Sequence, residues 1–92
     1  MKKDNKDNEI KVGSIIRIKS EEWDEYPNYC AGSKGIVVKI GNKYCKVECF
    51  ARVGLINVEF NHLEVIDKSR FDDYENKWIG SLYKRNNLEE ED

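Results

Sequence analysis

Four side chains of this sequence have the chemistry of metal ligands: Cys30, Cys45, Cys49 and the single histidine, His62. A structural zinc site takes four cysteine or histidine ligands, usually as two closely spaced pairs. Cys45 and Cys49 are four residues apart, and the other two stand alone in the sequence. On a β-strand both cysteines share one face with Val47, so we expect them to be small core residues without a metal.

The sequence contains no set of residues that predicts an enzyme. His62 has no serine, cysteine or aspartate motif beside it, and the sequence has no glycine-rich loop of the kind that cradles phosphates. We therefore expect a surface or capping role for His62, no catalytic residue and no cofactor. The expected function is the binding of another macromolecule.

The most informative segment for binding is residues 20–34, SEEWDEYPNYCAGSK, which breaks the alternation before it and carries turn formers. It predicts a long loop rather than a helix, and long loops in compact domains are commonly functional. Acids and aromatic side chains gather in its first ten residues. The candidate partner-binding residues of this loop are Glu21, Glu22, Trp23, Asp24, Glu25, Tyr26 and Tyr29.

Two interpretations of these side chains stay open. In the first, the rings provide rigid contact area in a groove, and the acids attract Lys or Arg of a protein partner. In the second, the rings fold back over an open end of the domain and the acids are solvated. Replacing Trp23 by alanine distinguishes them, because the first predicts lost binding and the second predicts lost stability.

Charge is unevenly distributed along the chain, although the net charge is only -2. Residues 20–29 carry -4 and residues 67–92 carry -3, whereas residues 1–19 carry +3 and residues 30–66 carry +2. The mildly basic strands suggest nucleic-acid binding as the alternative function, because Lys and Arg bind phosphates. The residues available for it are Arg17, Lys34, Lys39, Lys43, Lys46 and Arg52.

The length of 92 residues allows one domain. Charged residues make up 37% of the chain, but its two tryptophans, five tyrosines and three phenylalanines argue against overall disorder. No apolar run approaches the roughly 18 residues needed to cross a bilayer, so we expect a cytoplasmic protein without a membrane partner. An odd number of cysteines cannot form a complete disulfide framework, and we expect reduced thiols.

Alternating patterns predict five strands, at residues 12–19, 35–40, 43–50, 55–60 and 63–66, and therefore a mainly β domain. In the first strand, Val12, Ile16 and Ile18 share one face. Gly41-Asn42 supplies a two-residue hairpin turn. Five short strands close most naturally into a small barrel, because closure hides the strand edges.

After residue 66 the period changes to that of an amphipathic helix. Its apolar stripe consists of Phe71, Tyr74, Trp78 and Leu82, widened by Ile79 and Tyr83. Ser69 followed by Asp72 resembles a capping box, which places the helix start near residue 70. We expect the helix to pack on the barrel or, alternatively, to contact a partner through Trp78. The predicted organisation is a disordered arm at residues 1–9, a barrel at 10–66, and a helix with an acidic tail at 67–92.

The order of these motifs resembles the SH3-like small-barrel superfamily, and KOW-type modules in particular. The resemblance rests on residues 12–18 (VGSIIRI), 32–40 (GSKGIVVKI), 47–48 (VE) and 61–66 (NHLEVI). The chain is also similar to small uncharacterised SH3-like proteins of phages and mobile elements, in which a Tyr-Pro loop precedes a Gly-x-Lys-Gly-x-Val turn. The match covers residues 10–66 and implies a five-stranded SH3-like barrel followed by a C-terminal amphipathic helix.

The resemblance is specific for the fold and not for one function, because folds of this kind host many unrelated partners. The lack of catalytic motifs in the sequence makes a non-enzymatic binding module the expectation. KOW modules usually present a basic loop to RNA, whereas the equivalent loop here is acidic, so the expected partner is a protein. The similarity to mobile-element proteins implies a regulator or inhibitor of a host factor, such as a defence nuclease. A KOW-like nucleic-acid-binding barrel is the alternative.

Overall fold

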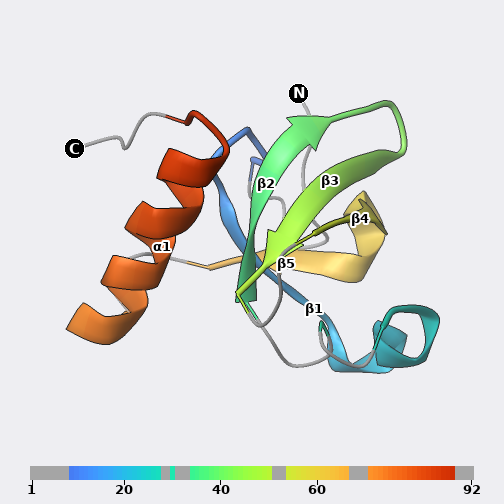
Figure 1. The fold of residues 1–92 in the computed structure, drawn as a ribbon. Coiled ribbons are helices and arrows are strands. Elements are labelled where there is room, and N and C mark those ends of the chain that lie inside the picture. Colours follow the sequence, from blue (N-terminus) through green and yellow to red (C-terminus); the bar gives the residue numbers. More distant parts are fainter. Residues whose placement is uncertain (1–8, 28–29, 31–33, 51–53, 67–70, 89–92) are drawn as a thin grey trace.

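The computed structural model describes residues 9–27, 30, 34–50, 54–66 and 71–88. These residues form a mainly β domain, in which five antiparallel strands build one sheet and a C-terminal helix follows (Figure 1). Some of the predictions concern other parts of the chain. The arm at residues 1–8, the candidate site residues Tyr29 and Arg52, the capping Ser69 and the tail after residue 88 lie outside the described residues.

The strands are β1 (Ile15–Ile18), β2 (Lys34–Ile40), β3 (Tyr44–Cys49), β4 (Leu55–Glu59) and β5 (Leu63–Val65). They lie in the order β4-β3-β2-β1-β5, so the first strand pairs with both the second and the last. Two 3-10 helices complete the sheet region: η1 (Ser20–Glu25) follows β1, and η2 (Phe60–His62) precedes β5. Each strand overlaps one of the five predicted from the sequence.

Two segments differ locally from their predicted structure. β1 begins at Ile15, so Val12 lies in the turn before it and is exposed rather than on the inner face of a strand. Residues 20–25, predicted as part of a loop, form η1, whose first turn contains Glu21 and Glu22. Acidic side chains are favourable at the start of a helix because its backbone N–H groups carry partial positive charge.

The turn between β2 and β3 is centred one residue later than predicted. The N–H of Gly41 donates to the carbonyl of Tyr44 (2.8 Å), so Asn42 and Lys43 are the two turn residues. Gly41 is not in the left-handed region, and a Cβ there would meet only a carbonyl oxygen at 3.0 Å. At Gly35, by contrast, a Cβ would lie 2.7 Å from a backbone carbonyl oxygen of β3. Close strand packing therefore requires a glycine at position 35.

One side of the sheet encloses a first hydrophobic core. Ile16 and Ile18 of β1 point into it, as their alternation predicts, while Ile15, the residue before Ile16, points to the other side. The core also contains Ile10, Cys30, Val37, Cys45, Val47, Cys49, Val58 and Leu63. This arrangement follows from the period-2 geometry of a strand, which sends successive side chains to opposite faces.

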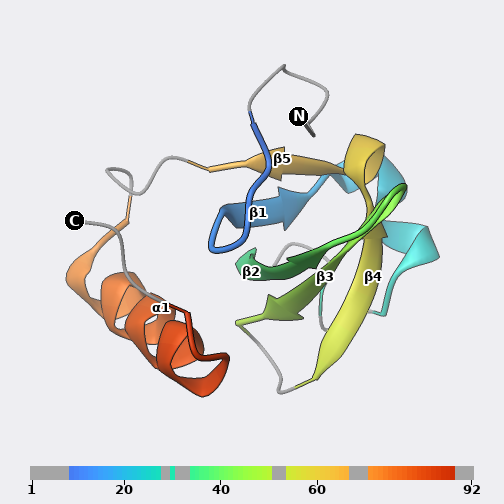
Figure 2. The same cartoon turned by 90° about the horizontal axis from the view of Figure 1, so that it is seen from above.

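The helix α1 (Asp73–Arg85) packs beside the sheet and closes a second core (Figure 2). Its buried residues are Ile79, Leu82 and Tyr83, which pack with Ile15 and Ile36 of the first two strands. The helix therefore docks on its own domain, which is one of its two predicted placements. Docking explains why Ile15, on the outward side of β1, is as deeply buried as the inward Ile16.

Two details of the helix correct the sequence-based prediction. It begins at Asp73 rather than near residue 70, and the N–H of Asn76 donates to the carbonyl of Asp72 (3.0 Å). Tyr74 and Trp78, predicted within the buried stripe, are exposed. Their rings meet edge to face, with centroids 6.2 Å apart. The sheet contacts the side of the helix that carries Ile79, Leu82 and Tyr83.

A buried charge connects β3 to the end of the helix. Glu48 is only 3% exposed and is the buried charged residue of the described part of the chain. Its carboxylate accepts hydrogen bonds from Arg85 Nη1 (3.2 Å), Asn86 Nδ2 (2.9 Å) and the N–H of Gly54 (3.2 Å). These bonds offset the cost of burying a carboxylate, and they hold the C-terminal end of α1 on the sheet.

Candidate functional site

The acidic candidate segment folds as η1, which contains no buried residue. The indole N–H of Trp23 donates to the carbonyl of Ile18 (3.0 Å), while 39% of the residue remains exposed. Glu21, Asp24 and Glu25 are exposed on the same short helix. The result is an aromatic ring tethered by its polar atom, accessible to solvent and placed among carboxylates.

Tyr26, the residue directly after Glu25, is partly buried instead. Its hydroxyl lies 2.8 Å from Nδ1 of His62 and accepts a hydrogen bond from the N–H of Glu59 (3.2 Å). The ring packs against the first core, and burial raises the pKa of the hydroxyl. Tyr26 therefore covers the core, as the second interpretation expects, while Trp23 stays accessible to solvent.

Three carboxylates surround His62, whose side chain is 15% exposed. Its Nε2 lies 3.1 Å from Glu59 and 3.4 Å from Glu22, and its Nδ1 lies 3.7 Å from Glu25. The donor atoms of Glu22, Glu25 and His62 lie within 4.8 Å of one another, and they are of types that bind zinc. The same contacts tie η1 to η2. Sequence reasoning missed this cluster, because partners 37 or 40 positions apart in the chain leave no local signal.

The five basic candidates that lie in the described ranges do not form one surface. Lys39 and Lys46 stand directly opposite each other in β2 and β3, and both are exposed. Lys43 lies in the turn that joins the same two strands. Lys34 lies at the far end of β2, where its Nζ is 4.7 Å from the centroid of the Phe71 ring. Only the first three lysines therefore gather at one place, the β2–β3 hairpin.

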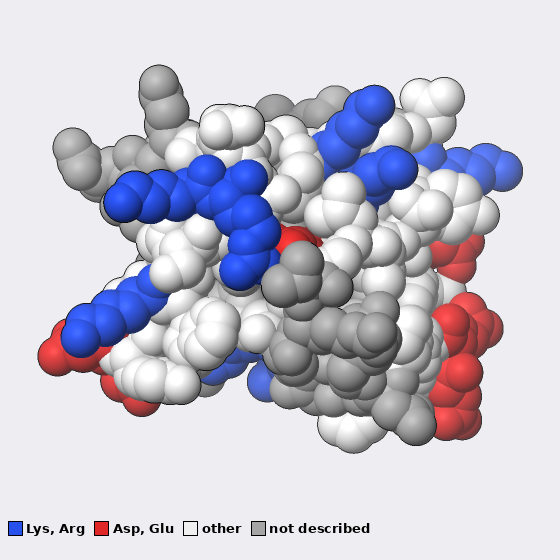
Figure 3. All heavy atoms as spheres, in the orientation of Figure 1, with Lys and Arg blue, Asp and Glu red and all other residues white. Residues whose placement is uncertain are grey.

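Arg17, the remaining described basic candidate, is already paired. Its guanidinium forms an ion pair with Glu64, in which Nε lies 2.9 Å from the carboxylate. In Figure 3, Lys and Arg side chains gather over the C-terminal end of α1 and over the β2–β3 hairpin. Most of the Asp and Glu side chains seen on that face lie at its margins, toward η1 on one side and toward the start of α1 on the other.

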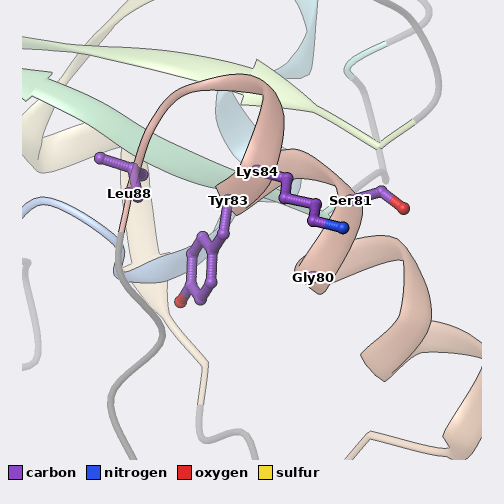
Figure 4. A pocket seen from close by; sticks show the side chains of 5 residues that line it. All are labelled: Gly80, Ser81, Tyr83, Lys84 and Leu88. Atoms are coloured by element: carbon purple, nitrogen blue, oxygen red, sulfur yellow. The ribbon is translucent and has the colours of Figure 1, made fainter.

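The helix offers two further features. Trp78 is as exposed as Trp23, at 39%, and its partner ring Tyr74 is 67% exposed. An open pocket lies near the C-terminal end of α1, where Gly80 has no side chain to fill it (Figure 4). The pocket is lined by Gly80, Ser81, Tyr83, Lys84 and Leu88. The hydroxyl of Tyr83 already donates to the carbonyl of Gly13 (2.5 Å), so it is committed to the fold.

The cysteines lie in the first core. Cys45 and Cys49 are buried with Val47, as their shared strand face predicts. Burial raises the pKa of Cys45 to about 11, and its Sγ lies 3.7 Å from the carbonyl oxygen of Val58. No pattern in the sequence predicts that Cys30 meets Cys49, yet their sulfur atoms lie 2.7 Å apart.

Comparisons with known proteins add no assignment to these surfaces. No protein-family model, curated protein or solved structure matches the chain. Within the described ranges, no helix has both the length and the apolar character needed to cross a bilayer. The geometry of η1, the hairpin and α1 is therefore the basis for a functional proposal.

Proposed function

We propose that this chain is a non-enzymatic, SH3-like small barrel that binds another protein through η1. The observation that carries this proposal is the placement of Trp23. Its indole N–H donates a hydrogen bond to the backbone, while its ring stays exposed. A ring fixed in this way loses little conformational entropy on binding, and tryptophan is the side chain most enriched at binding hot spots. An exposed, tethered tryptophan is therefore a suitable anchor for a partner.

The charge of η1 indicates the class of partner. Its four carboxylates, with no Lys or Arg among residues 20–25, favour a partner segment that is rich in Lys and Arg. A mobile-element protein that regulates or inhibits a host factor, such as a defence nuclease, is one form of this proposal. Nuclease surfaces that bind phosphates are basic, and an acidic surface is complementary to them.

The sheet order supports the SH3-like part of the proposal. The first strand pairs with both the second and the last, and a single 3-10 turn precedes the last strand. The expected barrel has the same succession of elements. Such a scaffold places the loop after its first strand on the surface, where segments that bind partners are commonly found.

The experiment uses the full chain and two synthetic peptides of equal length, one rich in Arg and Lys and one rich in Glu. Trp78→Phe leaves Trp23 as the single tryptophan, so that intrinsic fluorescence reports on η1. We expect a saturable change with the basic peptide and none with the acidic peptide. Neutralising Glu21, Asp24 and Glu25 to the corresponding amides should raise the Kd about tenfold, as expected for three partly exposed charges.

The anchor itself is tested by fluorescence anisotropy of a labelled basic peptide. Trp23→Ala should raise the Kd by about 30-fold, which corresponds to about 2 kcal/mol for a truncated aromatic anchor, and should leave the melting temperature within a few degrees. Trp78→Ala is the matched control, because both tryptophans are 39% exposed. If Trp78→Ala is the variant that loses binding, α1 is the binding surface. If Trp23→Ala unfolds the chain, Trp23 serves the fold.

A second candidate function rests on the β2–β3 hairpin. Lys39 and Lys46 face each other across the ladder in spite of their like charge, and Tyr44, two residues before Lys46, is 48% exposed. Basic side chains beside an exposed aromatic ring are typical of single-strand nucleic-acid binding. A labelled oligonucleotide should then bind with salt-dependent affinity, and Lys39→Glu with Lys46→Glu should abolish that binding.

A further inference from the structure

Two of the three cysteines meet inside the first core. Sγ of Cys30 and Sγ of Cys49 lie 2.7 Å apart, and both residues are almost completely buried. A disulfide bond is about 2.0 Å long, so closing it would need a movement of less than about 1 Å. Cys30 is held in place by its N–H, which donates to the carbonyl of Pro27 (2.9 Å), and Cys49 is the last residue of β3.

We propose that Cys30 and Cys49 are a site of oxidative modification, at which an intramolecular disulfide forms and cross-links the segment after η1 to the end of β3. The third thiol has a different environment. Cys45 faces the carbonyl oxygen of Val58 and remains a free thiol in both states. All three cysteines are free thiols in the structure, as the odd cysteine count predicts, and the proposal adds an oxidised state because the count does not show which two sulfurs meet.

The proposed oxidant is a small disulfide such as glutathione disulfide. One cysteine thiolate attacks a sulfur of the oxidant, breaks its S–S bond and forms a mixed disulfide while one glutathione thiolate leaves. The second cysteine thiolate then attacks the protein-bound sulfur of that mixed disulfide and releases the second glutathione. The two protons lost by the cysteines end on the two glutathione thiols. Two protein thiols are thus oxidised, and one glutathione disulfide is reduced.

The environment of the pair predicts that the exchange is slow in the folded state. Burial raises the pKa of both thiols, and the thiolate is the reacting form. Attack on the oxidant therefore requires local opening, and the cross-link forms most readily while the chain folds. Once formed, it closes a loop between residues 30 and 49 and restricts the unfolded chain, which should raise the melting temperature by roughly 10 °C or more.

The test refolds the full chain from denaturant in a mixture of reduced and oxidised glutathione and then analyses it by thiol titration, intact mass and disulfide mapping. We expect one free thiol of three, a mass lower by two hydrogen atoms, no bound glutathione, and a Cys30–Cys49 peptide pair. Three free thiols, or pairs that include Cys45 in comparable amounts, would overturn the proposal.

Two variants keep the result independent of folding defects. Cys45→Ala should give no free thiol after the same treatment and the same rise in melting temperature between its reduced and oxidised forms. Cys30→Ser removes one partner of the pair and leaves Cys49 in β3. This variant should keep Cys45 and Cys49 as free thiols or carry a bound glutathione, and its melting temperature should not rise after the treatment. A rise in melting temperature of equal size in Cys30→Ser would contradict the assignment.

Discussion

Replacing Glu48 by alanine should lower the free energy of unfolding by about 3 kcal/mol. The substitution removes three hydrogen bonds from a carboxylate that is 3% exposed. A hydrogen bond to a charged group contributes about 1.5–3 kcal/mol when buried, and the bond to Arg85 is discounted because that side chain is 42% exposed. The amide of Asn86 also loses a partner, although it keeps the carbonyl of Leu82 (2.9 Å).

Urea unfolding followed by circular dichroism measures this loss. For a domain of 92 residues, about 3 kcal/mol corresponds to a fall in melting temperature of about 12 °C or more. Glu48→Gln keeps the volume and one acceptor oxygen, so it should cost less, about 1–2 kcal/mol. Hydrogen exchange of the amides of α1 should accelerate in Glu48→Ala, because the carboxylate fixes the C-terminal end of that helix to β3.

Arg17→Ala is the control for the loss of an ion pair at a more exposed site. The Arg17 side chain is 49% exposed, and its partner Glu64 lies on the edge strand β5, so the cost should stay below about 1 kcal/mol. If Glu48→Ala costs no more than Arg17→Ala, the bonds from Arg85, Asn86 and Gly54 contribute little, and the reasoning about a buried tie between β3 and α1 is refuted. A changed urea m value would instead indicate altered compactness.

Two further predictions concern the sheet and its core. Gly35→Ala should lower the free energy of unfolding by about 2 kcal/mol or more, because the added Cβ would lie 2.7 Å from a carbonyl oxygen of β3. Gly41→Ala should lower it by less than about 1 kcal/mol. Similar urea midpoints for the two variants would contradict this. Burial raises the pKa of Cys45 from 9.0 to about 11. The buried neutral thiol therefore contributes fully to the free energy of unfolding below pH 9. That contribution is lost between pH 9 and 11, at up to about 1.4 kcal/mol per pH unit. Cys45→Ala should flatten the decline in stability over that range, and an unchanged slope would show that this thiol does not contribute.

The strands could be predicted because their faces are decided locally. Ile15 and Ile16 are neighbours in the chain, and alternation alone sends one to each side of the sheet. The helix was less predictable, since its apolar side chains span a wide arc and several stripes fit the same sequence. Only the sheet selects the arc that contains Ile79 and Leu82, and this choice leaves Trp78 at the surface.

The candidate site was predictable in composition but not in geometry. The acids and rings of residues 20–26 are visible in the sequence, yet the different placements of Trp23 and Tyr26 depend on residues elsewhere in the chain. Tyr26 bonds to His62, which is 36 positions away, and Cys30 meets Cys49 across 19 positions. Such contacts arise from strand pairing, and hydrophobic periodicity carries no information about them.

Backbone pairing also bears on the choice between the two proposed functions. Tyr44 of β3 stands directly opposite Glu59 of β4. It is two residues before Lys46, which pairs with Lys39 of β2. A nucleic-acid strand that followed the hairpin past Tyr44 would therefore approach Glu59 and the carboxylates around His62. With about three lysines contacting phosphates, the dependence of log K on log salt would be no steeper than about -3.

A protein partner is not limited in this way. Polypeptide segments carry both signs of charge, so one partner can place basic residues on η1 and acidic residues on the hairpin. Opposite charges on adjacent surfaces also fix the orientation of a bound partner, because the reversed orientation brings like charges together. The hairpin and η1 both contact η2, the first through the N–H of Phe60 on the carbonyl of Lys43 (3.3 Å) and the second through His62, and this arrangement favours a protein over a nucleic acid. The double exchange Lys46→Glu with Glu25→Lys should weaken the binding of a peptide that carries both charges. That loss should exceed the loss that either single change causes for a peptide of one charge.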